Sequence, residues 1–149
     1  MSTIAPGHVG LNVTDLERAR DFYEAVFGFE RLQESLVDDR RFVFLGEGRR
    51  VVLTLWQQSD GRFPTDRPGL HHLAFEVADV AAVHAAEKRV RATGATLLHD
   101  GVVPHGEGAS SGGIFFEDPD GVRLEIYAPT GAGDERPAPD ATAPTCGFF

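Results

Sequence analysis

Two histidines and one glutamate occupy related places in two similar stretches of this chain. His8 opens HVGLNV and His72 opens HLAFEV, and both stretches alternate polar or small residues with apolar ones, as half-buried strands do. Glu125 lies in RLEIY, a predicted strand that turns the carboxylate away from its apolar neighbours, and Thr54 has the matching place in VLTLW. Two imidazoles and a carboxylate on one sheet face suit a divalent transition metal with positions left open for a substrate. We therefore expect His8, His72 and Glu125 to bind a metal ion, although each taken alone is more simply an exposed polar residue.

Further polar residues share this expected sheet face or a loop beside it. His105 lies in the glycine-rich stretch DGVVPHGEGASSGG, which predicts a mobile lid, and an imidazole titrates near neutral pH. Tyr127 follows Glu125 by two residues and so shares its face. We expect His105 and Tyr127 to be catalytic groups that transfer protons. The expected substrate-binding residues are Asn12, Thr54, Trp56, Glu76 and His71.

Aromatic residues gather in two neighbouring predicted strands, RFVFLG and RVVLTLWQQ. Phe42, Phe44 and Trp56 are candidates for a wall on which an aromatic ligand stacks. Aromatic residues of a small sheet are more often part of the core, and the sequence leaves both interpretations open.

The elements that must position these side chains repeat along the chain. Residues 8–30 and 72–96 each begin with a histidine, alternate for about six residues as a strand does, reach Asp15 or Asp79 and then turn helical. Each predicted helix is followed by further strands, which in the second half lie around ATLLHD, GIFFE and VRLEIYA. The predicted order is a strand, a helix and three strands, twice.

The ends of the predicted helices carry recognisable signals. Thr14 and Glu17 have the spacing of a capping box at the start of the first helix, and Gly28 suits the left-handed position just past its end. Gly94 has the corresponding place after the second helix. These signals bound two helices of three to four turns each.

Composition and length narrow the class of protein. The chain has 149 residues, with 23 acidic against 14 basic ones and a net charge of -9, which argues against a nucleic-acid surface. A single cysteine excludes an internal disulfide, the N-terminus lacks the pattern of a signal peptide, and no apolar run approaches the ~20 residues of a spanning helix. We expect a cytoplasmic protein with no membrane partner.

The domain boundaries follow from a change in composition near residue 128. Residues 1–128 are expected to form one domain, with a first module at about 6–58 and a second at about 70–128. Residues 129–149, rich in Pro, Ala, Gly and Asp, predict a flexible C-terminal tail. The apolar ending CGFF either docks into a groove or is disordered.

Three longer motifs connect the chain to a known family. GHVGLNVTDLERARDFYEAVFGFE, HHLAFEV and EDPDGVRLEIY resemble the vicinal oxygen chelate superfamily, which includes glyoxalase I, bleomycin and fosfomycin resistance proteins and extradiol dioxygenases. The resemblance implies an α+β fold of two tandem βαβββ modules, forming a curled mixed-sheet cup with helices on its outer face. It also implies metal ligands at His8, His72 and Glu125, and makes His72 rather than His71 the ligand.

Departures from the family patterns help to choose among its branches. Glyoxalase I resembles this pattern with a fourth ligand, usually a carboxylate, at the place of Thr54, so its chemistry is disfavoured. Fosfomycin resistance enzymes commonly use a lysine-containing cationic cluster, whereas Lys88 is the only lysine here. Extradiol dioxygenases use the same two histidines and glutamate for iron, with a tyrosine near the place of Phe115 and Phe116; Tyr127 is a candidate replacement.

The sequence as a whole predicts a divalent-metal-dependent enzyme. We expect it to be dioxygenase-like or lyase-like and to act on a small oxygenated substrate, aromatic as one option, chelated to Fe, Mn, Zn or Ni. A homodimer is expected because curled half-sheets have edges that a partner can cover. The alternative is a noncatalytic drug-binding protein that confers antibiotic resistance by sequestering a bleomycin-type drug.

Overall fold

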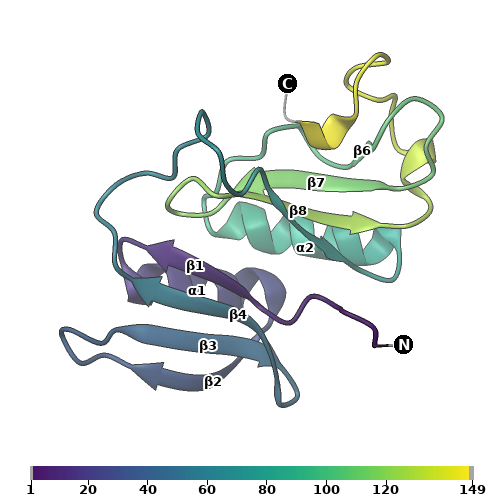
Figure 1. The fold of residues 1–149 in the computed structure, drawn as a ribbon. Coiled ribbons are helices and arrows are strands. Elements are labelled where there is room, and N and C mark those ends of the chain that lie inside the picture. The colour runs from purple at the N-terminus through teal and green to yellow at the C-terminus, as the bar shows by residue number, and fades with distance from the viewer. Residues whose placement is uncertain (1, 148–149) are drawn as a thin grey trace. The chain divides into compact units, whose positions relative to one another are not determined.

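The computed structural model describes residues 2–147 of the chain. It divides into two compact units, Met1–Arg62 and Phe63–Phe149. Each unit contains one helix and one four-stranded mixed sheet, so the chain has the α+β fold of tandem βαβββ modules (Figure 1). No helix within residues 2–147 is long and apolar enough to cross a membrane.

The first unit packs one helix against one sheet. Within the sheet the strand order is β1-β4-β3-β2, with β1 parallel to β4 and the other pairs antiparallel. The helix contacts β4 and β3 through a stripe of buried apolar residues that recur at helical spacing. The elements are β1 (Val9–Val13), α1 (Leu16–Phe27), β2 (Glu30–Ser35), β3 (Phe42–Glu47) and β4 (Arg50–Gln57).

The start of α1 differs from the predicted capping box. Asp15, in extended backbone conformation, is the N-cap, and its Oδ1 accepts a hydrogen bond of 3.0 Å from the backbone N–H of Arg18. The prediction of Thr14 as the cap is therefore wrong, because Asp15 lies directly before the first helical residue and reaches the same orphan amides. The predicted end is confirmed: Gly28 has a φ of 69° and closes the helix in the left-handed conformation.

The second unit has the same element order. Its sheet runs β5-β8-β7-β6 with β5 parallel to β8, and α2 contacts β8 and β7. Its elements are β5 (Leu73–Glu76), α2 (Val80–Ala92), β6 (Val103–Pro104), β7 (Gly112–Glu117) and β8 (Arg123–Ala128), followed by two 3-10 turns, η1 (Ala132–Asp134) and η2 (Thr145–Gly147).

One predicted strand of the second unit is shorter and later than expected. The stretch ATLLHD contributes only an isolated bridge between Leu97 and Phe116, and the strand that pairs with β7 is β6. A tight turn separates the two: Gly101, at a φ of 96°, donates its N–H to the His99 carbonyl over 2.9 Å. Because of this turn, the chain forms a regular strand pair with β7 only from residue 103.

The strand registers of the two units correspond. Thr54 on β4 is paired with Gly10 on β1, and Glu125 on β8 is paired with Ala74 on β5, as the predicted superposition of the two halves requires. The neighbouring apolar side chains are buried at 0–2% exposure, on the side of each sheet that its helix contacts. These are Leu53, Leu55, Leu124 and Ile126.

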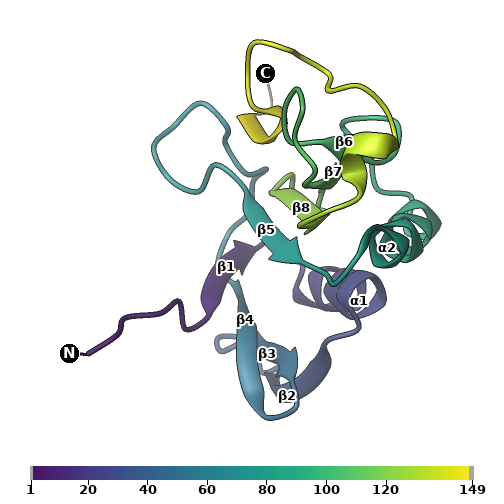
Figure 2. The ribbon, with the colours of Figure 1, turned by 90° about the vertical axis from the view of Figure 1, so that its right-hand side faces the viewer.

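The segment after β8 contacts its own unit at two places. At η1 the buried Ala132 donates its N–H to the Ser110 carbonyl, 2.9 Å away. At η2 the buried Thr145 donates its N–H to the His105 carbonyl (2.8 Å) and its hydroxyl to the Pro104 carbonyl (2.7 Å). Figure 2 shows this segment, in yellow, leaving η1 and returning beside β6 and the loop that follows it. The flexibility expected for residues 129–149 remains a prediction, and Phe148 and Phe149 lie outside the described residues.

Candidate functional site

A buried carboxylate lies at the centre of the second unit's sheet. Glu125 on β8 is only 2% exposed, and burying a carboxylate is costly unless partners compensate it. Its Oε1 accepts a hydrogen bond from His105 Nε2, and His72 Nε2 lies 3.5 Å from its Oε2. Two imidazoles from different segments therefore approach the two oxygens of one carboxylate.

His105 is held on both sides of its ring. Because a carboxylate only accepts hydrogen bonds, Nε2 of His105 must carry the proton that it shares with Glu125. In a neutral ring Nδ1 is then an acceptor, and it lies 2.8 Å from the hydroxyl of Ser111, which donates to it. The main chain of His105 is also anchored, since its N–H donates to the Ser111 carbonyl and its carbonyl accepts from Thr145.

His72 is fixed by the histidine that precedes it. The Nδ1 atoms of His71 and His72 lie 2.8 Å apart, so one ring donates and the other accepts. Burial lowers the pKa of His72, with the charge of Glu125 opposing the shift. Burial thus favours the neutral imidazole, which is the form that binds a metal.

Tyr127 forms the rim of the same face. Its hydroxyl donates to Glu76 Oε2 over 2.9 Å, and its ring centroid lies 5.2 Å from that of His105. Glu76 and Tyr127 are direct partners across β5 and β8. The hydrogen bond to Glu76, together with burial, raises the pKa of Tyr127. The phenol therefore stays protonated at neutral pH and is a donor rather than a base.

The predicted metal ligands are brought together in part. His72 and Glu125 lie side by side, and the groups on the buried carboxylate are imidazoles, which suit a transition metal as donors. His8 is an exposed residue just before β1 in the first unit. Within the described residues 2–147, no group of three or more His, Cys, Asp or Glu side chains has the geometry of a metal site. The donor types fit a metal ion, and its binding remains a proposal.

The remaining predicted residues lie in the first unit. Thr54 is buried and its hydroxyl accepts a hydrogen bond of 3.0 Å from Trp56 Nε1. The side-chain carbonyl of Asn12 accepts from the backbone N–H of Gln58 over 2.9 Å. Each of these polar groups has a structural partner, and roles in substrate binding remain predictions.

Sequence reasoning missed Ser111. Its hydroxyl holds Nδ1 of His105, yet it lies six positions further along an irregular glycine-rich loop. Neither strand nor helix periodicity applies there, so spacing gives no sign that the two side chains meet. The only available hint is the clustering of hydroxyl residues in ASSGG.

The comparisons with known proteins identify the family. The chain belongs to the Glyoxalase/Bleomycin resistance protein/Dioxygenase superfamily, whose model matches residues 5–126. It is 31% identical over 124 residues to a catechol-2,3-dioxygenase of Bacillus subtilis, covering 82% of this chain and 40% of that protein. It is 32% identical over 125 residues to a lactoylglutathione lyase of Neisseria meningitidis, covering 80% of this chain and 86% of that one.

A solved structure shares the fold of this chain. A glyoxylase/bleomycin resistance protein/dioxygenase domain from Frankia superposes with a TM-score of 0.73 at 24% identity, covering 85% of this chain and 93% of that chain. This likeness concerns the fold. The chain spans 40% of the length of the dioxygenase relative, so the activity is a matter for proposal.

Proposed function

We propose that the chain is a divalent-metal-dependent enzyme, dioxygenase-like or lyase-like, that acts on a small oxygenated substrate. His8, His72 and Glu125 would hold the ion, with iron, manganese, zinc and nickel as candidates. When bound, such an ion chelates adjacent substrate oxygens and stabilises the negative charge that develops on them. The observation that carries the proposal is the buried carboxylate of Glu125 with the imidazoles of His72 and His105 on its two oxygens.

The chain's own residues have separable tasks in this proposal. His105, held by Ser111, orients the carboxylate of Glu125. His71 holds the ring of His72. Tyr127 is protonated at neutral pH, and its hydroxyl, which donates to Glu76 in this structure, would turn to give a hydrogen bond or its proton to a substrate oxygen.

The environment of Thr54 supports a dioxygenase-like rather than a glyoxalase-like reaction. Thr54 has the register position that corresponds to Glu125, but its hydroxyl is neutral, buried and bonded to Trp56. A neutral hydroxyl is a poor ligand for a divalent ion compared with a carboxylate. A three-ligand set leaves more positions open for substrate and oxygen.

Activity measurements on protein purified without chelator test the proposal. We expect oxygen uptake with catechol rather than turnover of lactoylglutathione, and this uptake should fall at least about 100-fold in Tyr127→Phe or His72→Ala. His84→Ala, a change on α2, is the matched histidine control and should keep full activity. If neither reaction occurs and a bleomycin-type drug binds wild type and His72→Ala with equal affinity, the protein sequesters a drug instead.

We also propose a homodimer. Each sheet has two end strands, β1 and β2 in the first unit and β5 and β6 in the second, and end strands are surfaces that a partner copy can cover. Light scattering of the purified chain should give twice the mass of 16.1 kDa. A mass of one chain at all concentrations would contradict a dimer.

A further inference from the structure

A cavity lies in the first unit, where β3 begins and β4 ends. It has a volume of about 230 Å³ and is lined by residues 39–42 and 56–58. None of the candidate metal ligands lines it. Because drug-sized ligands occupy sites of roughly 300 Å³ or more, this cavity suits a ligand with a single ring.

The amide of Gln57 has a fixed orientation at this cavity. Its Oε1 accepts from the backbone N–H of Leu16 over 2.8 Å and from Arg41 Nε over 3.3 Å. Both partners are N–H donors, so the atom that faces them must be the oxygen. The NH₂ group of Gln57 is left without a partner among residues 2–147. It provides two hydrogen-bond donors for a ligand.

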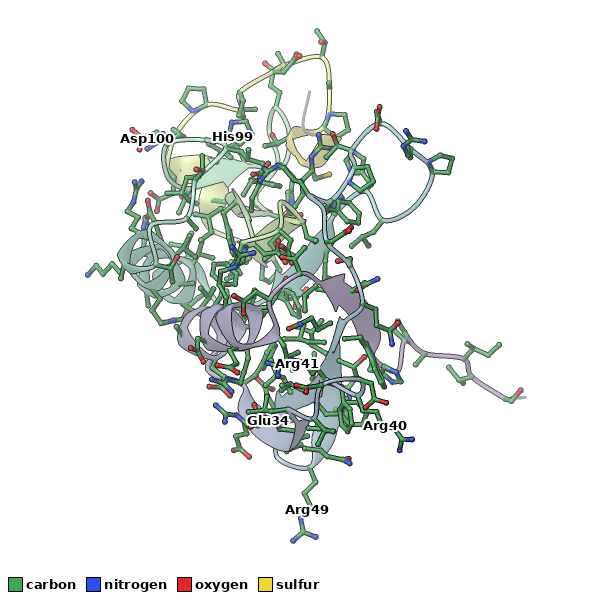
Figure 3. All side chains as sticks on the ribbon, turned by 90° about the vertical axis from the view of Figure 1, so that its left-hand side faces the viewer. Glu34, Arg40, Arg41, Arg49, His99 and Asp100 are labelled. Atoms are coloured by element: carbon green, nitrogen blue, oxygen red, sulfur yellow. The ribbon has the colours of Figure 1, made fainter. Side chains whose placement is uncertain are left out.

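Two arginines line the cavity. Arg41 uses three of its five N–H groups, on Gln57, the Leu36 carbonyl (3.0 Å) and Glu17 Oε1 (3.0 Å). These contacts fix its guanidinium and leave two donors. Figure 3 shows Arg41 beside α1 and Arg40 projecting away from the ribbon.

Guanidinium donors at the cavity can receive an anion. Arg40 is exposed at the rim of the cavity, and Asp39 is the only acidic residue in the lining. Arg41 is ion-paired with Glu17, which lies outside the lining. An anion is therefore received by the guanidinium of Arg40 and by the remaining N–H donors of Arg41.

Two aromatic rings complete the cavity. Phe42 and Trp56 are cross-strand partners on β3 and β4, with ring centroids 5.4 Å apart and planes inclined by 33°. The bond from Trp56 Nε1 to Thr54 holds the indole in place. Both rings are half-buried and line the cavity, so each keeps accessible surface for a planar ligand.

We propose that this cavity binds a small aromatic monocarboxylate, with its ring on Phe42 and Trp56 and its carboxylate on the Gln57 amide and the arginine guanidinium groups. Charge-assisted hydrogen bonds from a guanidinium to a carboxylate are among the strongest polar contacts in proteins. A neutral ring of the same size lacks this part of the binding energy. The inference does not require a bound metal, although Trp56 is also one of the expected substrate-binding residues.

Benzoate is the probe, and Trp56 is the reporter because it is the only tryptophan of the chain. Titration of the full chain should change the Trp56 fluorescence saturably, with a dissociation constant below about 10 mM. Benzyl alcohol, which has the same ring without the charge, should bind at least about tenfold more weakly. No response to benzoate, or equal binding of the alcohol, overturns the proposal.

Gln57→Glu is the sharpest variant. It keeps an oxygen acceptor for Leu16 and Arg41 but replaces the NH₂ donors by negative charge, so benzoate affinity should fall at least about tenfold. Gln33→Glu on the exposed surface of β2 adds the same charge outside the cavity and should bind as wild type does. Equal affinity of Gln57→Glu and wild type contradicts the proposal.

Two further variants keep the test decisive. Arg40→Gln changes an exposed side chain and should weaken benzoate binding about threefold even if Gln57→Glu is poorly folded. His72→Ala should bind benzoate with unchanged affinity. Loss of benzoate binding in His72→Ala would place the ligand at the candidate metal site and overturn the inference. If the chain binds no metal, the proposal of benzoate binding is unaffected.

Discussion

Individual side chains on the Glu125 face have distinct hydrogen-bonding roles. Glu125 accepts, His105 is clamped between Glu125 and Ser111, and Tyr127 donates to Glu76. Each polar group has the complementary partner that its chemistry requires. These hydrogen bonds orient the protons of the side chains, and the buried carboxylate among them has partners that compensate its charge.

The bond between Tyr127 and Glu76 gives a prediction at this scale. Tyr127→Phe should lower the free energy of unfolding by about 0.5–1 kcal/mol, because a partly exposed hydrogen bond contributes little net stability. Glu76→Gln, which keeps an acceptor, should cost less than Glu76→Ala. Urea unfolding of the single and double variants measures the coupling. If Tyr127→Phe costs as much in the Glu76→Ala background as in wild type, the bond contributes nothing.

The alternation of side chains along strands predicted that His72 and Glu125 share a sheet face, and in the structure their side chains are 3.5 Å apart. It could not predict the contact of Ser111 or the orientation of the Gln57 amide, because both depend on the tertiary positions of loops and helix ends. Asp15 shows a smaller limit. Two adjacent capping residues, Thr14 and Asp15, are both chemically suitable, and only the backbone conformation decides between them.

At the scale of elements, β7 and β8 can lie close together because residue 113 of β7 is a glycine. A Cβ on Gly113 of β7 would run into the Ile126 carbonyl and lie 2.6 Å from Tyr127 Cα. Gly113 is paired with Tyr127, so a side chain there would push β7 away from β8 and displace the strand that carries Glu125.

Gly113→Ala should therefore destabilise the fold by about 1–3 kcal/mol or more, because backbone atoms cannot move aside as a flexible side chain can. Gly106→Ala is the control, since a Cβ there has no neighbour within 4 Å. Thermal unfolding of both variants measures the difference. Equal melting temperatures would show that β7 and β8 have more freedom than this packing implies.

The contact between α2 and the segment after β8 predicts a pH dependence. His84 on α2 lies 2.9 Å from Glu135 and 3.4 Å from Glu87, and the hydrogen bond to Glu135 is the main cause of its raised pKa. A raised pKa in the folded state means that protonated His84 stabilises the fold. That stabilisation is fully present below the ordinary value of 6.5 and is lost as the pH rises through the raised value.

His84→Gln should remove this dependence, so that the stability difference between wild type and variant is larger at pH 5.5 than at pH 8.5. The effect should stay below about 1 kcal/mol and shrink in high salt, because 43% of the His84 side chain is exposed. Glu135→Gln should behave in the same way. Denaturant midpoints at the two pH values provide the measurement, and a pH-independent difference would contradict it.

The whole molecule is built from two units with one element order, and most of this architecture was readable from the sequence. Periodicity gave the helices and the strand correspondence of Thr54 with Glu125, because registers follow from which residues must be buried. The short β6 was missed because a two-residue strand between turns leaves no periodic signal. What periodicity cannot supply is chemistry, and the metal assignment of His8, His72 and Glu125 still depends on binding data.

A metal titration of the chelator-stripped chain tests that assignment most directly. Calorimetry with Mn²⁺, Fe²⁺, Ni²⁺ and Zn²⁺ should show one ion per chain for at least one of these metals. His8→Ala, His72→Ala and Glu125→Gln should each weaken binding by at least about 100-fold, more than loss of an outer hydrogen bond usually does, and His84→Ala should leave it unchanged. Absence of binding, or full-strength binding in His72→Ala and Glu125→Gln, would contradict the account.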